Sequence, residues 1–318
     1  MKTVLLFFSL PISTFFWGFF GHQKINQYAI YTLPSEMSGF YRMNKDYLIE
    51  NAVNPDKRRY AVEGEAPRHY IDWDVYPAYI RDSLVQMPWK KAVDWLSEDT
   101  LQAYGIVPWH VIFMKYQLTK AFEERDVRKI LRVSAEIGHY IADANVPLHT
   151  TRNYNGQETN QYGIHGFWES RLPELFFPEF HLWVGKATYL SNPTEEIWNG
   201  VLQANRALDS VFTLEKKLTL QMGLDKKYTV TERNKQTVRA YSYPFSEAYF
   251  QALNGQVERQ MKRSIKMVGD FWYTAWVDAG QPDLQKLAPY IRTQSDEKEE
   301  VEMKKLWLKR LRTVRPEE

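Results

Sequence analysis

Histidine and carboxylate residues recur in this chain at a spacing that suits a metal ion. Asp143 follows His139 by four residues, Glu169 follows His165 by four residues, and His149 lies between the two pairs. Residues four apart lie on one face of a helix, so an imidazole and a carboxylate at this spacing can converge on a single ion. A lone histidine near an apolar face is more often a core residue, but two matched pairs around a third histidine are hard to explain by packing. We therefore expect a metal site formed by these five residues.

The other histidines divide into two groups. His22 lies directly after an apolar N-terminal stretch, and His69 follows Asp56 by thirteen residues, so both extend the ligand pattern. His110, at the expected start of a helix, and His181, in an aromatic stretch, are interpreted as structural. Five of the seven histidines are then candidate ligands.

The amino-acid composition restricts the chemistry that such a site can perform. The chain has no cysteine, which excludes thiol nucleophiles, disulfides, iron–sulfur clusters and thiolate zinc sites. Imidazole nitrogens and carboxylate oxygens in open coordination are a donor set that suits zinc. The formal net charge is only +2 across 318 residues, which argues against a protein that coats duplex DNA.

The order of the candidate ligands resembles a known superfamily. Trp17 and His22 are followed by Asp56, His69, His139, Asp143, His149, His165 and Glu169, and the segment from Gly138 to His149 is especially close to the family core. This order is similar to that of the trinuclear-zinc phosphodiesterases, which comprise bacterial zinc-dependent phospholipases C and plant and fungal single-strand-specific nucleases. The resemblance covers residues 17 to about 174, and the remainder matches only in being helical.

The resemblance implies three zinc ions per chain. The first would be held by Asp56, His69, His139 and Asp143, and the second by His149, His165 and Glu169. The third would take His22, Asp143 as a bridging ligand, and the amino group and carbonyl of Trp17 as the mature N-terminus. A zinc-activated hydroxide would attack phosphorus, with Asp56 as the catalytic residue that orients the water and Asp72 as the alternative.

Two features depart from a single family pattern. The spacing from Trp17 to His22 is nuclease-like, whereas Glu169 at the end of the second ligand set is phospholipase-like. Cleavage before Trp17 would also leave Phe16 at the position where small residues are expected.

The substrate is less constrained than the metal. Asn153, Tyr154 and Asn160, with Gln161 and Tyr162, lie between two ligand histidines and could contact a phosphate or a base, or could be ordinary turn residues. We expect a phospholipase C-like hydrolase of phosphoric esters. A single-strand-specific nuclease or 3'-nucleotidase is the alternative, with single-stranded nucleic acid in place of phospholipid. A secreted helical zinc-binding protein without catalysis also stays open, and no obligate protein partner is inferred.

The elements that must position these residues are expected to be helices. Apolar residues recur at three- and four-residue steps over 127–144, 111–124, 195–222 and 245–279, and prolines separate these stretches. Alternating strand patterns are scarce, and 228–231 is the best candidate. The sequence therefore predicts an all-α, single compact multi-helix domain over residues 17–290, with the metal cluster in a cleft.

The two ends of the chain differ from this domain. Residues 1–16 combine an early lysine with a short apolar run, which predicts a signal peptide and export to the periplasm or the extracellular space; an uncleaved membrane anchor is the alternative. No later segment is apolar enough to span a membrane. Residues 291–318 are dominated by charge and are expected to form a solvated tail or terminal helix, with contact to lipid or nucleic acid as the alternative.

Overall fold

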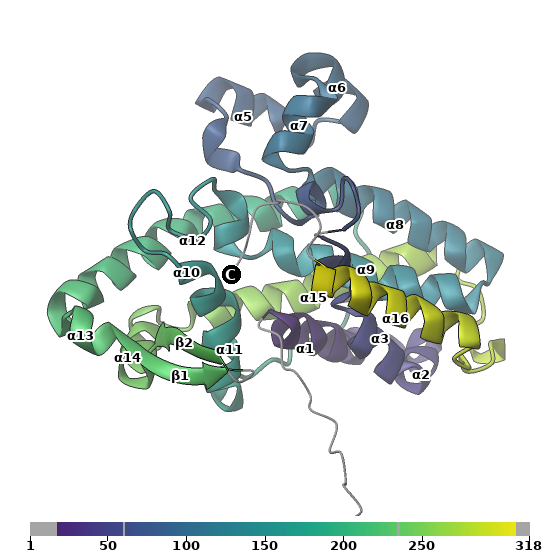
Figure 1. Ribbon diagram of the computed structural model, residues 1–318. Coiled ribbons are helices and arrows are strands. Elements are labelled where there is room, and N and C mark those ends of the chain that lie inside the picture. Colours follow the sequence, from purple (N-terminus) through teal and green to yellow (C-terminus); the bar gives the residue numbers. More distant parts are fainter. Residues whose placement is uncertain (1–17, 60, 234–235, 310–318) are drawn as a thin grey trace, which may run out of the picture.

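The computed structural model describes residues 18–59, 61–233 and 236–309, and most of these residues are helical (Figure 1). The described part of the chain contains a single two-stranded sheet. The prediction of an all-α fold is therefore confirmed. The expected signal peptide, residues 1–16, and Trp17 lie outside the described residues.

Helix α9 (Val127–Ala144) lies at the centre of the fold and has the bounds that the apolar pattern predicts. Its side chains are buried from Ile130 onward at nearly every position, and the carboxylate of Asp126 accepts a hydrogen bond from the Lys129 amide to cap its N-terminus. It packs most extensively against α1 (Phe19–Ala29), α3 (Lys45–Asn51), α8 (Val107–Glu124) and α15 (Gln256–Asp278). Residues carried by α9 are thus held from several sides.

The other elements of the N-terminal half surround this core. They are η1 (Ile30–Thr32), α2 (Ser35–Met43), α4 (Asn54–Arg59), η2 (Ala66–His69), η3 (Trp73–Val75), α5 (Ala78–Leu84), α6 (Trp89–Leu96) and α7 (Glu98–Tyr104). Helices α5, α6 and α7 form a lobe that stands apart from the main body, above α8 and α12 in Figure 1.

The C-terminal half continues after α9. Its elements are η4 (Pro147–Thr150), α10 (Ile164–Gly166), the π-helical turn η5 (Phe167–Arg171), α11 (Leu172–Phe176), η6 (Phe177–Glu179), α12 (Pro193–Met222), α13 (Leu224–Lys227), β1 (Tyr228–Arg233), β2 (Gln236–Tyr241), α14 (Tyr243–Ala252), η7 (Leu284–Lys286) and α16 (Gln294–Lys309). The strand predicted over 228–231 is confirmed as part of β1, which pairs antiparallel with β2 in the register Tyr228 to Tyr241.

The helical pattern over 245–279 is divided between α14 and α15. Asn254 and Gly255 both have positive φ, 47° and 73°, and this left-handed backbone ends one helix and starts the next. The apolar spacing is the same on both sides of the break, so periodicity alone did not show it.

A glycine sets the distance between α1 and α9. A Cβ atom at Gly138 would lie only 2.0 Å from Oδ1 of Asn26, whose amide nitrogen donates to the carbonyl of Ala135 at 3.0 Å. Helices approach this closely only where the contact residue has no side chain. This contact brings His22, one turn before Asn26, against His139, with ring centroids 3.9 Å apart.

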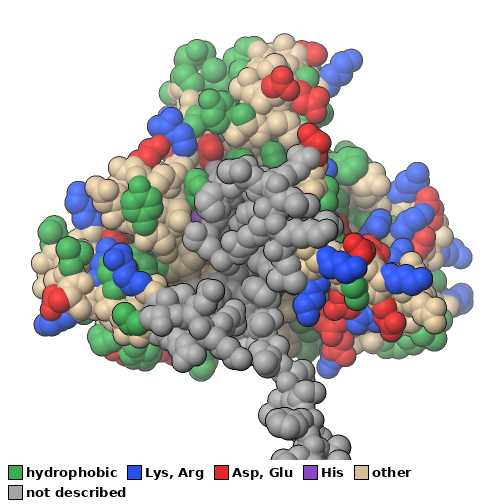
Figure 2. Space-filling view, viewed as in Figure 1, with side chains coloured by type: hydrophobic (Ala, Val, Ile, Leu, Met, Phe, Trp, Pro, Cys, Tyr) green, Lys and Arg blue, Asp and Glu red, His purple; other side chains and the backbone are tan. Residues whose placement is uncertain are grey.

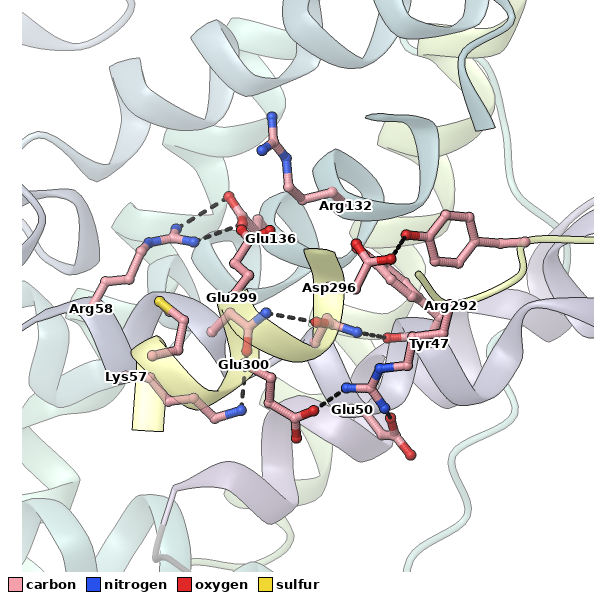
Figure 3. Close-up of a pocket in the computed structure, with 14 residues that line it drawn as sticks. Tyr47, Glu50, Lys57, Arg58, Arg132, Glu136, Arg292, Asp296, Glu299 and Glu300 are labelled. Atoms are coloured by element: carbon pink, nitrogen blue, oxygen red, sulfur yellow. Dashed lines mark hydrogen bonds and ion pairs between the residues drawn. The ribbon is translucent and has the colours of Figure 1, made fainter. Parts of the chain in front are cut away.

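The described part of the charged segment 291–318 includes helix α16, which packs against α4. Its N-terminal turn is held by the ion pairs of Arg128 with Asp296, at 2.8 Å, and with Glu299, at 2.6 Å. A cavity of 190 Å³ lies beneath it, and Figure 3 shows that most of its labelled side chains are charged, among them Arg58 and Glu136. Lysine, arginine, aspartate and glutamate side chains also gather over α16 in Figure 2.

Across the described ranges, no helix combines the length and the apolar character that crossing a bilayer demands.

Candidate metal centre

Eight of the nine predicted ligands are described, and they converge from seven elements onto one buried cluster. They are His22 of α1, Asp56 of α4, His69 of η2, His139 and Asp143 of α9, His149 of η4, His165 of α10 and Glu169 of η5. Their nitrogen and oxygen atoms form four overlapping groups of three, in each of which the ligand atoms lie within 4.8 Å of one another. We call this set the ligand cluster.

Asp143 lies at the centre of the ligand cluster and uses its two oxygens in different directions. Its Oδ2 lies 2.9 Å from Nδ1 of His69 and 3.2 Å from Nε2 of His139. Its Oδ1 lies 3.4 Å from Nε2 of His22. Asp56 completes the first side, with Oδ1 3.4 Å from Nε2 of His139. The carboxylate of Asp143 thus lies between two sets of imidazoles, as a bridging ligand must.

Glu169 divides its oxygens in the same way. Its Oε2 lies 2.7 Å from Nε2 of His165 and 3.3 Å from Nε2 of His149, while its Oε1 lies 3.5 Å from Nε2 of His22. The contacts with His149 and His165 match the predicted second ligand set. The contact with His22 was not predicted, and it connects the second set with the third.

Three imidazoles are held in orientation by a hydrogen bond from the ring nitrogen that faces away from the cluster. Nδ1 of His139 contacts the carbonyl of Ala52 at 2.9 Å, Nδ1 of His165 contacts the carbonyl of Tyr154 at 3.2 Å, and Nδ1 of His149 contacts the carbonyl of His69. A carbonyl oxygen can only accept, so each Nδ1 donates its proton and each Nε2 faces the cluster with a lone pair when the ring is neutral. Metal-binding histidines are held in this way.

His69 has the reverse orientation and a carboxylate behind it. Its Nδ1 faces Asp143, and its Nε2 lies 3.8 Å from Oε1 of Glu65. Glu65 is buried, and it accepts hydrogen bonds from the Tyr140 hydroxyl and from Nη1 of Arg68 at 2.9 Å. Glu65 is not among the predicted site residues, although it precedes His69 by four residues, the same interval that separates the members of the two predicted pairs.

Charge inside the cluster is balanced by imidazoles. Burial alone would raise the pKa of Asp143, but His139 and His149 outweigh it and hold this pKa well below its usual value. Burial likewise would lower the pKa of His139, and the facing carboxylates Asp143 and Asp56 raise it instead. Asp56 and Glu169 also have lowered pKa values, because neighbouring histidines outweigh their burial. All three carboxylates are therefore ionised at neutral pH.

Several imidazole nitrogens in the cluster lack a hydrogen-bond partner within the described residues. They are buried and comprise Nδ1 of His22, Nε2 of His69 and Nε2 of His165. The ring nitrogens that face the carboxylates are Nε2 of His22, His139, His149 and His165 and Nδ1 of His69, and together with the ionised carboxylates they form a donor set that fits a divalent cation. The donor set, with nitrogen and oxygen and no sulfur, fits zinc.

Solvent reaches the cluster unevenly. The side chains of Asp56 and Glu169 are 16% and 13% exposed, whereas that of Asp143 is 1% exposed. A cavity of 30 Å³ also adjoins the cluster, with Gly18, His22 and Glu169 among its lining residues. Asp143 thus forms the floor of the cluster, and Asp56 and Glu169 lie at its accessible side.

The predicted substrate residues have structural partners in the loop between His149 and His165. The Asn153 side chain donates to Oγ1 of Thr159 and accepts from the Glu158 amide, and Tyr154 contributes its carbonyl to His165. Asn160 is exposed with φ of 59°, which is typical of a turn. Gln161 is buried and donates to Glu215 of α12. The loop residues thus shape and anchor the loop, and substrate contact by Asn153, Tyr154 and Asn160 stays a prediction.

The remaining candidates lie outside the ligand cluster. His110 is buried against Tyr140, with ring centroids 4.4 Å apart, and His181 is exposed on the surface. Asp72 is buried beside Tyr76. Burial is the main cause of the raised pKa of Tyr76, and the negative charge of Asp72 is the second cause. Arg58 is ion-paired with Glu136 at 2.7 Å.

The comparison with known proteins adds no family assignment. No family model matches the chain, and no curated protein matches its sequence.

Proposed function

We propose that this protein is an exported zinc-dependent hydrolase of phosphoric esters, of the phospholipase C type. The observation that supports this most strongly is the ligand cluster itself. Five imidazoles and three ionised carboxylates from seven elements meet in a buried cluster, and their partners orient at least four of the rings toward it. A closed structural zinc site needs only four protein ligands. The cluster has eight described members, which is more than a purely structural site would need.

The residues divide into three sets that would hold three zinc ions. Asp56, His69, His139 and Asp143 form one set, because each of the two carboxylates contacts both imidazoles, and His149, His165 and Glu169 form another. His22, Asp143 and Glu169 form the third, to which the resemblance adds the amino group and carbonyl of Trp17. Ligation by Trp17 requires removal of residues 1–16, so export would complete this set.

Asp56 is the more accessible of the two carboxylates in the first set, as a base that receives a proton from water must be. Zinc, when bound, makes water nucleophilic at neutral pH and polarises phosphoryl oxygens. Asp56 is ionised, and its side chain is 16% exposed, so it can accept a proton from a water that reaches the accessible side of the cluster. Asp143 is too buried for this role and serves to fix His69, His139 and His22 around it.

The charge of the chain favours lipid over polynucleotide. A net charge of +2 gives little of the long-range attraction by which nucleic-acid enzymes bind a phosphate backbone. Glu169 at the end of the second ligand set also follows the phospholipase form of the resemblance.

An activity panel on the full chain loaded with zinc tests the proposal. Phosphatidylcholine, single-stranded DNA, RNA and bis(4-nitrophenyl) phosphate are offered to the native protein, Asp56→Asn and Asp270→Asn. Asp270 is a control because it is also an aspartate in an ion pair, but its partner is Lys266 of the same helix and not a member of the ligand cluster. We expect lipid and chromogenic ester hydrolysis that Asp56→Asn lowers by at least about 10²-fold and Asp270→Asn retains.

Three results would contradict this assignment. Cleavage of single-stranded DNA without lipid hydrolysis would identify the nuclease alternative. Zinc-loaded protein inactive on every substrate would favour a non-catalytic zinc-binding protein. Equal losses in the two variants would remove Asp56 from the reaction.

A further inference from the structure

Aromatic side chains gather where helix α1 and its continuation η1 meet the irregular segment that follows α11. Phe177 contacts Phe20 and Tyr28 edge to face, with ring centroids 5.1 Å and 6.3 Å apart. Trp183 contacts Tyr28 and Tyr31, with ring centroids 5.7 Å and 5.5 Å apart. We call these five residues the aromatic face. None of them belongs to the ligand cluster.

Two members of the aromatic face are open to solvent. Trp183 is 68% exposed and Tyr31 is 44% exposed, although their rings contact each other and the ring of Tyr28. A single exposed aromatic side chain is ordinary in a protein surface, but exposed rings that gather in one place mark an interaction site. The aromatic face is therefore expected to have a partner.

The backbone that carries Trp183 is fixed on both sides of this residue. The amide of His181 donates to Oε1 of Glu258 at 3.1 Å, and the amide of Ala187 donates to the carbonyl of Thr32 at 2.8 Å. A partner that buries the indole ring of Trp183 thus orders no additional stretch of chain, which keeps the entropic cost of binding low.

The two segments that supply most of the aromatic face contain no acidic residue. Residues 18–34 and residues 180–192 have neither aspartate nor glutamate, although the chain has 39 of these residues. The lysines of the two segments are Lys24 and Lys186, and the acidic residues that flank them are Glu36 and Glu179. Both segments therefore carry positive charge, which favours an anionic partner.

Cations also lie against the rings of the aromatic face. Nζ of Lys24 lies 5.2 Å from the ring centroid of Phe177, and the guanidinium carbon of Arg42 lies 5.9 Å from that of Tyr31. The cores of protein–protein interfaces are depleted of lysine, so a lysine among the rings disfavours a protein partner. Tryptophan and tyrosine together with lysine and arginine are typical of surfaces that lie in the headgroup layer of a bilayer.

We propose that the aromatic face docks this protein on the surface of an anionic phospholipid bilayer. Trp183 and Tyr31 enter the headgroup layer, and the lysines and Arg42 contact lipid phosphates. The proposal rests on the proposed function, because a hydrolase of phospholipids meets its substrate in a bilayer. Helix α1 joins the two sites, since it carries His22 of the ligand cluster on its buried side.

Cosedimentation of the full chain with vesicles of phosphatidylcholine and phosphatidylglycerol tests this surface. Every binding variant also carries Asp56→Asn, which keeps the lipid intact. We expect Trp183→Ala to weaken vesicle binding about tenfold, because its ring no longer enters the headgroup layer. Trp95→Ala is the matched control, since Trp95 is also an exposed tryptophan, 43% exposed on α6, but lies next to Asp94. All variants share residues 1–16, so a difference between two of them reports on the replaced side chain.

A charge reversal tests the electrostatic attraction and leaves the rings in place. Lys186→Glu should weaken binding to the mixed vesicles about tenfold at low salt, and this effect should shrink as salt is raised, because exposed charges are screened. Lys216→Glu is its control, since Lys216 is an equally exposed lysine on α12. Circular dichroism of each variant confirms that the fold is retained.

Hydrolysis of bis(4-nitrophenyl) phosphate separates this proposal from the proposed function. This ester is soluble, so Trp183→Ala and Lys186→Glu with Asp56 in place should hydrolyse it at the native rate. Vesicle binding that depends on Trp183, in a chain that hydrolyses no ester, would support the docking surface and contradict the proposed function. Hydrolysis of the soluble ester without vesicle binding would do the reverse.

Three further outcomes would overturn the proposal. The first is an equal effect of Trp183→Ala and Trp95→Ala on vesicle binding. The second is binding of single-stranded DNA, but not of vesicles, that Trp183→Ala abolishes, which would make the aromatic face a nucleic-acid surface. The third is a dimer in light scattering that Trp183→Ala dissociates, which would assign the aromatic face to a second copy of the chain.

Discussion

The ligand cluster around Asp143 and the buried ion pair of Glu215 with Lys227 are both polar groups inside the helical fold, but they are completed differently. Glu215 of α12 is fully buried and accepts from Lys227, from Gln161 and, at 3.2 Å, from the Tyr241 hydroxyl. Asp143 is equally buried, but the groups that face it are imidazoles.

The partner of the buried carboxylate, lysine in one cluster and imidazole in the other, decides whether the protein alone satisfies its charge. Lysine carries its own charge, so the Glu215 pair is satisfied by the protein alone. The imidazoles of the ligand cluster face its carboxylates with nitrogens that bind either a proton or a metal ion. The Glu215 cluster is thus complete within the protein, whereas the donor set of the ligand cluster is compatible with a bound metal ion.

The largest effect is expected from replacing the bridging carboxylate. Asp143→Asn should lower the zinc content from three ions to one, because Asp143 belongs to two ligand sets and zinc binding to small domains is worth about 10 kcal/mol or more. Glu215→Gln, an equally buried carboxylate, should keep all three. Elemental analysis of the purified variants measures this, and equal zinc content in the two would erase the distinction between the clusters.

Breaking the buried ion pair should affect stability but not metal. Lys227→Met leaves Glu215 charged and without its lysine, which is expected to cost about 3–5 kcal/mol of unfolding free energy. Glu215→Leu with Lys227→Met removes both charges and should recover most of that loss. Denaturant unfolding and elemental analysis together test this. Gln161, in the loop between His149 and His165, donates to Glu215. Loss of zinc in Lys227→Met would therefore show that this hydrogen bond couples the two clusters.

A smaller effect on zinc binding is expected from replacing Glu65, which faces His69 from outside the cluster. Glu65→Gln keeps the shape of the side chain but removes the charge that faces Nε2 of His69, so zinc affinity should fall about 10- to 100-fold. Glu136→Gln serves as its control, since Glu136 shares the partner Arg58 and is not among the ion-pair partners of His69. Competition with a zinc-binding dye measures the zinc affinities of the two variants. Equal losses of affinity in Glu65→Gln and Glu136→Gln would assign the effect to their shared partner Arg58 and not to His69.

The smallest expected effect is a pH trend that differs between metal-free and zinc-loaded protein. The pKa of His139 is raised in the folded metal-free chain, so its contribution to stability is present below about pH 6.5 and is lost as pH rises through the raised value. Zinc binds neutral imidazole, so its stabilisation grows over the same range.

Thermal unfolding with and without chelator, from about pH 6 to about pH 9, tests this trend. The difference in Tm between the two forms should widen as pH rises. The carboxylates, whose pKa values are lowered, stabilise the fold by a constant amount above about pH 4 and lose this contribution only below it, so they add no trend inside this window. A constant difference would contradict the role given to His139.

Local pattern predicted much of the fold and of the candidate site. The bounds of α9, the end of that helix before His149, and the two pairs four residues apart all follow from helix periodicity and from Pro147. The left-handed break at Asn254 and Gly255 was missed, because the apolar spacing continues across it. The partner of Gln161 was also missed, because Glu215 lies 54 residues away.

The sequence by itself determined the donor types, their order and their pairing along single helices, because helix geometry is a property of neighbouring residues. Only the tertiary structure decided that Asp143 meets His69 across 74 residues, that Glu169 reaches His22, and that Glu65 lies behind His69. Those contacts depend on how α1 and α9 approach at Gly138 and on the loops that carry His69 and His149. The packing of a whole core fixes such distances, and no short stretch of sequence contains them.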